Sequence, residues 1–108
     1  MAAACAGGGA QSAKPGPAIR VSGDDNMRFT PAEIRVPAGQ MATVEFVNTG
    51  QILHDFSTRG QPANVTIASP PGSPRRGTFT SASPGRYEFF CGQAGHEPAG
   101  MKGTLIVE

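Results

Sequence analysis

Four side chains of this 108-residue chain are of types that bind a soft metal ion: His54, Cys91, His96 and Met101. Three of them share one run with the spacing Cys-x4-His-x4-Met, and His54 lies well upstream. Thiolate, imidazole and thioether ligands together favour copper or zinc over calcium or magnesium. Two imidazoles and one thiolate, with a weak methionine bond on the axis, form the type 1 (blue) copper site of electron-transfer proteins. The sequence therefore predicts one copper ion bound by these four residues.

The combination of these residues is more specific than any one of them. A lone buried cysteine is usually an inert small hydrophobe, and a lone histidine is more often a surface or core residue than a ligand. Here the run Tyr87-x-Phe89-x-Cys91 ends a predicted strand, and another strand follows Met101. Single-electron transfer through Cu(II) and Cu(I) is the first hypothesis. A copper-handling or non-redox β-sandwich module is the alternative, and it predicts loose metal binding without blue colour.

Enzymatic versions of a copper site need more ligands than this chain supplies. A binuclear site needs a second cysteine in the ligand loop, where Gly95 stands instead, and a multicopper oxidase domain needs more than the two histidines present. We therefore expect an electron carrier and not an enzyme. The net charge of +1 also provides no field that would attract nucleic acid.

Short strands are the elements expected to position these ligands. The chain contains 15 Gly and 10 Pro, so few windows reach the length of about 10–12 residues that a helix needs. Alternating apolar residues between frequent turn signals are typical of a β-sandwich or barrel. We predict an all-β fold of about eight or nine strands, with candidates over residues 18–22, 27–30, 33–36, 40–48, 54–57, 64–68, 78–81, 85–91 and 103–107. The proline-rich stretch 69–77 is predicted to be an exposed loop.

The first seventeen residues differ in composition from the rest, being mostly Ala and Gly with one charged side chain, Lys14. We predict a flexible tail or tether over residues 1–17 and one domain over residues 18–108. The run around Cys5 resembles the end of a bacterial lipoprotein signal, although no charged or strongly apolar region precedes it. A membrane tether through Cys5 and an Ala-rich end without function stay open alternatives. A Cys5–Cys91 disulfide is not expected, because it would consume the copper thiolate.

The C-terminal motif resembles that of the cupredoxins, the small blue copper proteins. It reads Gly85-Arg-Tyr87-Glu-Phe89-Phe-Cys91-x4-His96-x4-Met101-Lys-Gly103. Its ligand spacing is most similar to that of auracyanin and rusticyanin. Upstream, the run from Phe29-Thr-Pro31 through Phe46-x-Asn48 to His54-Asp-Phe56 is similar to the N-terminal half of the same family.

This resemblance implies a Greek-key β-sandwich with copper at one end. It implies that Tyr87 is a tyrosine-corner residue, and that the backbone N–H groups of Asp55 and Gln93 donate to the Cys91 sulfur. The carbonyl of Leu53 lies where some family members place a weak axial oxygen. The N–H donors would stabilise the thiolate and raise the reduction potential.

The resemblance also implies how electrons leave the site. In this family the second histidine lies inside an apolar surface patch where partners dock, and His96 is surrounded by small residues: Ala94, Gly95, Pro98, Ala99 and Gly100. Weak redox encounters use such small interfaces. The expected partners are cytochromes, quinol-oxidising complexes or terminal oxidases, and the expected protein is an exported monomer, periplasmic or on the outer face of the membrane.

One departure from the family concerns the two segments that carry the ligands. Azurin and plastocyanin have Asn after the first histidine and Ser or Thr after the cysteine, and these side chains link the segments. The matching residues here are Asp55 and Gly92, so that link cannot form. Asp55 is either an acceptor close to the ligands or an exposed side chain, and the sequence leaves both open.

Overall fold

The computed structural model describes residues 18–108, which form nine strands and no helix. The predicted tail over residues 1–17, with Cys5, lies outside the described residues. The strands are β1 (Ile19–Asp24), β2 (Arg28–Thr30), β3 (Glu33–Val36), β4 (Met41–Asn48), β5 (His54–Ser57), β6 (Thr66–Ser69), β7 (Arg75–Thr80), β8 (Gly85–Phe90) and β9 (Lys102–Val107). In these residues no helix is long and apolar enough to cross a membrane.

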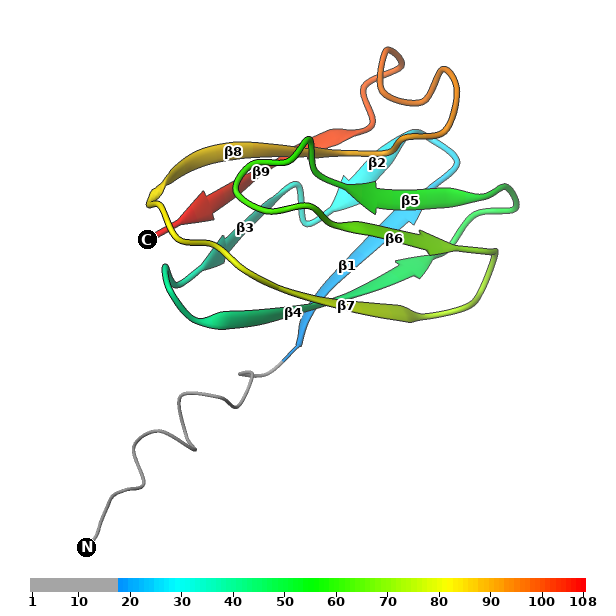
Figure 1. The fold of residues 1–108 in the computed structure, drawn as a ribbon. Coiled ribbons are helices and arrows are strands. Elements are labelled where there is room, and N and C mark those ends of the chain that lie inside the picture. Colours follow the sequence, from blue (N-terminus) through cyan, green and yellow to red (C-terminus); the bar gives the residue numbers. More distant parts are fainter. Residues whose placement is uncertain (1–17) are drawn as a thin grey trace, which may run out of the picture.

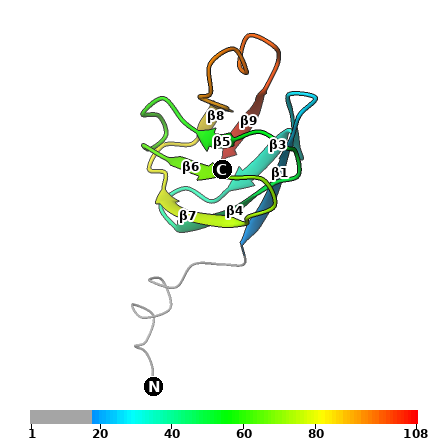
Figure 2. The ribbon, with the colours of Figure 1, turned by 90° about the vertical axis from the view of Figure 1, so that its right-hand side faces the viewer.

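Two sheets face each other as the layers of a sandwich, as Figures 1 and 2 show. One sheet has the order β2-β1-β4-β7 and the other β3-β9-β8-β5-β6. Most neighbouring strands are antiparallel, but β1 pairs with β4 and β3 pairs with β9 in parallel. Parallel neighbours cannot be joined by a tight hairpin, and between β1 and β4 the chain passes through β3 of the other sheet. The predicted all-β sandwich is confirmed.

Alternating side chains of both sheets form the core. In β4, Val44 and Phe46 are fully buried, as the period of two in a strand requires. Phe29 contacts three other rings, with centroid distances of 5.9 Å to Phe46, 6.3 Å to Phe56 and 4.9 Å to Phe89. This aromatic cluster joins the two layers, because Phe29 and Phe46 come from one sheet and Phe56 and Phe89 from the other.

The tyrosine corner predicted at Tyr87 has the expected contact. The Tyr87 hydroxyl donates a hydrogen bond of 2.8 Å to the backbone carbonyl of Ser83, four residues upstream. Such a bond back to the preceding turn is the mark of a tyrosine corner in β-sandwiches. It holds the entry to β8, the strand that leads to Cys91.

The largest error in the predicted strands concerns β7. The stretch 69–77 was predicted to be an exposed loop, but Ser69 is buried at the end of β6 and β7 already begins at Arg75. Arg76 lies opposite Glu45 of β4 and forms an ion pair with it at 3.2 Å. A strand was predicted over residues 78–81, but the charged first half of β7 lies on the sheet edge without hydrophobic alternation and was therefore assigned to the loop.

Apart from β7, β3 and β5 have the predicted ends, and the ends of the remaining strands lie within two residues of the predicted ones. β1 continues through Gly23 to Asp24, β2 omits Met27, and β6 starts at Thr66 rather than at position 64. β4 begins one residue later than predicted and β9 one residue earlier. β8 ends at Phe90, which leaves Cys91 as the first residue after the strand.

Candidate metal centre

The segment between β8 and β9 projects from one end of the sandwich (Figure 1, orange) and carries three of the four predicted ligands. It is built of short turns: the His96 N–H donates to the Gln93 carbonyl at 3.0 Å, and the Met101 N–H donates to the His96 carbonyl at 3.1 Å. Gly95 and Gly100 have φ angles of 82° and 110°. Glycine adopts such angles without steric cost, so these two residues allow the segment to fold back at Met101.

Cys91 and His54 approach each other at the ends of two neighbouring strands of one sheet, β8 and β5. Both side chains are fully buried. The Cys91 sulfur lies 4.0 Å from His54 Nδ1, and the backbone N–H of Asp55 donates to the same sulfur at 3.3 Å. Because His54 begins β5 while Cys91 follows β8, the sandwich itself fixes their separation.

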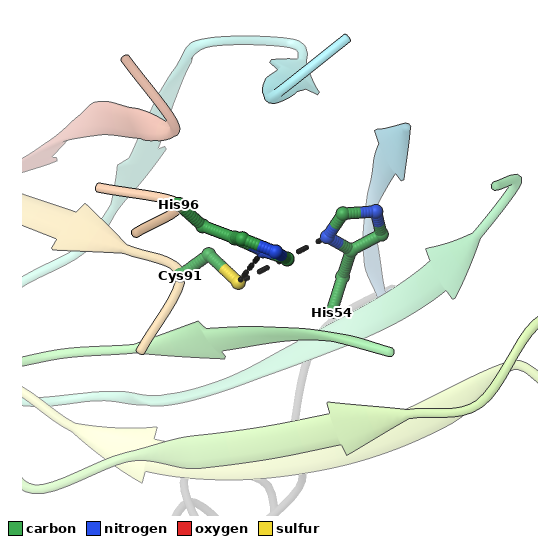
Figure 3. A group of neighbouring side chains, drawn as sticks. All are labelled: His54, Cys91 and His96. Carbon is green, nitrogen blue, oxygen red and sulfur yellow. Dashed lines mark hydrogen bonds between the residues drawn. The ribbon is translucent and has the colours of Figure 1, made fainter. Parts of the chain in front are cut away.

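His96 completes a group of three ligand atoms. Its Nδ1 lies 3.3 Å from the Cys91 sulfur, and the rings of His54 and His96 are 5.0 Å apart between centroids. Figure 3 shows the three side chains pointing toward one another. Their ligand atoms all lie within 4.8 Å of one another. Two imidazole nitrogens facing one sulfur are a donor set that suits a soft metal ion such as copper.

The surroundings of the Cys91 sulfur act on its pKa in opposite directions. Burial raises the pKa of the thiol and outweighs the other effects. The backbone N–H groups of Asp55 and Gln93 lower the pKa of Cys91, since they donate to the thiolate, whereas the negative charge of Asp55 raises it. The backbone N–H groups of Asp55 and Gln93, which the family resemblance implies as donors to Cys91, therefore both act on this sulfur.

Met101 is fully buried. Its backbone carbonyl accepts a hydrogen bond of 3.0 Å from the Cys91 N–H. The end of its side chain packs over Gly23 of β1, where an added Cβ would lie 2.9 Å from Met101 Cε and 2.9 Å from Phe46 Cζ. Its role as the axial ligand stays a prediction, as does the axial role of the Leu53 carbonyl.

Asp55 is an acceptor and not an exposed side chain. It is 4% exposed, and its Oδ1 accepts hydrogen bonds from the Gly92 N–H at 2.6 Å and from the Ser57 hydroxyl at 2.8 Å. Its Oδ2 accepts from Gln93 Nε2 at 2.8 Å. The side-chain link of azurin and plastocyanin cannot form with Asp55 and Gly92 at these positions. The carboxylate links the two ligand-bearing segments through a backbone N–H instead.

The small residues around His96 are exposed, as their predicted docking role requires: Ala94, Gly95, Pro98, Ala99 and Gly100. Two large apolar side chains just before His54 are exposed as well, Ile52 at 45% and Leu53 at 42%. The family resemblance pointed to Leu53 only through its backbone carbonyl, and this apolar surface was not predicted. Their apolar type was visible in the sequence, but their exposure was not.

Arg59 contacts the ligand-bearing segment from the β5–β6 connection. Its guanidinium pairs with Glu97, next to His96, and with Glu88 of β8 at 3.0 Å. It also lies over the Phe90 ring, 3.8 Å from the centroid, within the range of a cation–π contact. The hydrogen bond from Arg59 lowers the pKa of Glu97. No feature of the sequence indicated these contacts.

Asp25, in the turn between β1 and β2, was also missed. Its Oδ1 lies 2.8 Å from His54 Nε2, and its Oδ2 accepts from the Gln51 N–H at 2.7 Å. The Gln51 N–H, followed by the bond to His54, lowers the pKa of the Asp25 carboxyl. In the sequence, Asp24-Asp25-Asn26 is only a polar turn.

A β-sandwich that brings two histidines and one cysteine together at one end defines a mononuclear metal protein with nitrogen and sulfur ligands. Residues 1–107 match the family model of the cupredoxin-like domain, and the chain belongs to this family. The family and the His-Cys-His group together identify the cofactor as one copper ion. The buried sulfur and the two convergent imidazoles fit that ion.

Relatives and solved structures agree with this family. The chain is 33% identical to the copper-resistant cuproprotein CopI of Rubrivivax gelatinosus, over 89% of this chain and 69% of that protein. It is 34% identical to a chloroplastic plastocyanin of Physcomitrium patens, over 82% of this chain and 56% of that protein. The fold is similar to that of reduced auracyanin from Roseiflexus castenholzii, with a TM-score of 0.74 and 25% identity over 88% of this chain and 99% of that one.

Proposed function

We propose that this protein carries single electrons through a type 1 copper site, in which His54, Cys91, His96 and Met101 would hold the ion. The observation that carries the proposal is the convergence of two Nδ1 atoms and one buried sulfur within 4.8 Å. When bound, copper supplies the Cu(II)/Cu(I) couple. Similarity to a plastocyanin and to an auracyanin supports the same function.

The surroundings of the ligands favour electron transfer over catalysis. Four protein ligands leave no open position for a substrate, whereas catalytic metal sites keep one. The two ligand-bearing segments are linked through Asp55, which limits movement of Cys91 between the two copper oxidation states. When the ligands move little between the two oxidation states, the reorganisation energy of electron transfer is small. We therefore infer a carrier and not an enzyme.

His96 is the proposed port for electrons. It is partly exposed, whereas His54 is fully buried. The small exposed residues around it, together with Ile52 and Leu53, offer an apolar face on which a redox protein docks transiently. Cytochromes, quinol-oxidising complexes and terminal oxidases are the partners that the family resemblance suggests. The same resemblance supports an exported monomer, with a lipid anchor at Cys5 as a separate proposal.

Copper addition to the copper-free protein tests the site. We expect intense blue thiolate-to-copper absorption and a narrow copper hyperfine splitting, and a colourless product would contradict the proposal. Cys91→Ala should abolish the colour, and Cys5→Ala is the matched control that should keep it. Met101→Gln should keep copper with a lowered potential, while an unchanged potential would remove Met101 from the site.

Copper handling is the second candidate, because one relative is a copper-resistant cuproprotein. The two functions differ in what happens to the metal. A carrier exchanges electrons rapidly with a soluble cytochrome and retains its copper, whereas a handling protein releases copper to a competing chelator. Stopped-flow reduction and chelator competition on the same sample separate them.

A further inference from the structure

Asp25 links the two sheets at the metal-binding end. It lies in the turn between β1 and β2 of one sheet, and its Oδ1 is 2.8 Å from Nε2 of His54, which begins β5 of the other sheet. The His54 ring is fully buried, while the Asp25 side chain is 38% exposed. The carboxylate therefore reaches inward from the surface to the far side of a proposed copper ligand.

This contact determines which His54 nitrogen carries the proton. A carboxylate can only accept, so the neutral imidazole donates from Nε2 and leaves the lone pair on Nδ1. Nδ1 is the atom that faces the Cys91 sulfur at 4.0 Å. Asp25 thus selects the tautomer that metal binding at Nδ1 requires.

The chain around Asp25 is built to hold this carboxylate in place. Its Oδ2 accepts from the Gln51 N–H at 2.7 Å. An added Cβ at Gly50 would lie 2.0 Å from Asp25 Oδ1, so only glycine lets the carboxylate lie this close to the backbone. The Thr49 N–H donates to the Gly23 carbonyl at 2.9 Å, which holds the same loop against β1.

We propose that Asp25 is a positioning residue for the copper site, fixing the tautomer and orientation of His54 and lowering the reduction potential. A carboxylate hydrogen-bonded to a metal-ligating histidine makes the imidazole a stronger donor. A stronger donor stabilises Cu(II) more than Cu(I), so the charge of Asp25 opposes the effect of the N–H donors on Cys91. The statement on potential rests on the proposed function, whereas the statement on the tautomer does not.

The first experiment compares Asp25→Asn with Asp24→Asn. Asp24 lies in the same turn, and its side chain accepts from the Asn26 N–H at 2.9 Å rather than from His54. Both variants remove one negative charge, so Asp24→Asn controls for charge alone. Loss of such a histidine partner typically costs about 10–100-fold in metal affinity. We expect Asp25→Asn to weaken Cu(II) binding about tenfold relative to Cu(I) binding. For a one-electron couple, that change raises the reduction potential by about 59 mV. Equal shifts in the two variants would overturn the effect on potential.

The second experiment needs no copper. Nitrogen-15 NMR of the copper-free protein should show His54 protonated at Nε2, with a slowly exchanging ring proton, and Asp25→Ala should mix the two tautomers. His54 protonated at Nδ1 in the unmutated protein, or the same tautomer in Asp25→Ala, would overturn the positioning role. A protein that fails to become blue but shows the expected NMR result would contradict the proposed function while leaving the positioning role intact.

Discussion

The Asp55 carboxylate accepts the backbone N–H of Gly92 at 2.6 Å and so joins the residue after one proposed ligand to the residue after another. Asp55 follows His54, and Gly92 follows Cys91. An added Cβ at Gly92 would lie 3.3 Å from Asp55 Oδ2, closer than ordinary contact. Glycine at position 92 therefore leaves room for a buried carboxylate close to the backbone between the two segments.

Replacing Asp55 tests this link. Asp55→Ala leaves the Gly92 N–H and the buried Ser57 hydroxyl without their acceptor, and one unsatisfied buried polar group costs about 1–3 kcal/mol. We expect the free energy of unfolding of the copper-free protein to fall by about that amount, measured by urea denaturation. Asp55→Asn keeps an oxygen for Gly92 and should lose less. Equal losses in the two variants would show that the link contributes nothing specific.

Gly23→Ala probes the packing of Met101. The new methyl group would lie 2.9 Å from Met101 Cε, so the buried thioether must shift. We expect a loss of about 1–3 kcal/mol in stability, as for other overpacked cores, together with a changed copper spectrum and potential. Gly77→Ala is the control, because its methyl group would lie 2.8 Å from Ile67 and touch no proposed ligand. It should be destabilised with an unchanged spectrum, and the same spectrum in both variants would separate Met101 from the copper.

Arg59→Gln should loosen the ligand-bearing segment without unfolding the protein. The guanidinium is exposed, and exposed ion pairs contribute little to global stability. Its contacts with Glu97 and Phe90 nevertheless restrain that segment locally. We expect severalfold faster amide hydrogen exchange at Ala99 and Gly100 and an unchanged unfolding midpoint. Arg76→Gln, which breaks an ion pair on β7, should leave exchange at those two amides unaltered.

The raised pKa of Cys91 predicts how stability depends on pH in the copper-free protein. Above about pH 8.5, the cysteine in the unfolded chain loses its proton while the buried thiol keeps its own. The unfolded state then binds fewer protons, so the free energy of unfolding falls as the pH rises. The contribution is present below that pH and is lost as the pH passes the folded pKa. Urea denaturation between pH 7 and pH 10 should show this decline, and a decline of the same size in Cys91→Ala would assign it to other groups.

Local patterns predicted the elements that carry the ligands. Cys91, His96 and Met101 lie in one run, so their proximity follows from chain connectivity. The alternation in β4 and the glycines at positions 95 and 100 are likewise local, since side-chain period and positive φ are properties of neighbouring residues. β3 and β5 were predicted with the bounds that the structure has.

Only the tertiary structure decided which polar groups surround the ligands. Asp25 and His54 are 29 residues apart in the sequence, and Asp55 and Gly92 are 37 residues apart. Neither contact produces a periodic pattern in the sequence. Such contacts depend on the register of paired strands and on the crossing of the chain between sheets. The sequence by itself therefore predicted the type of metal site, through the chemistry of four side chains. The folded sandwich determined how its ligands are oriented and linked, because hydrogen bonds between distant segments exist only once the sheets are paired.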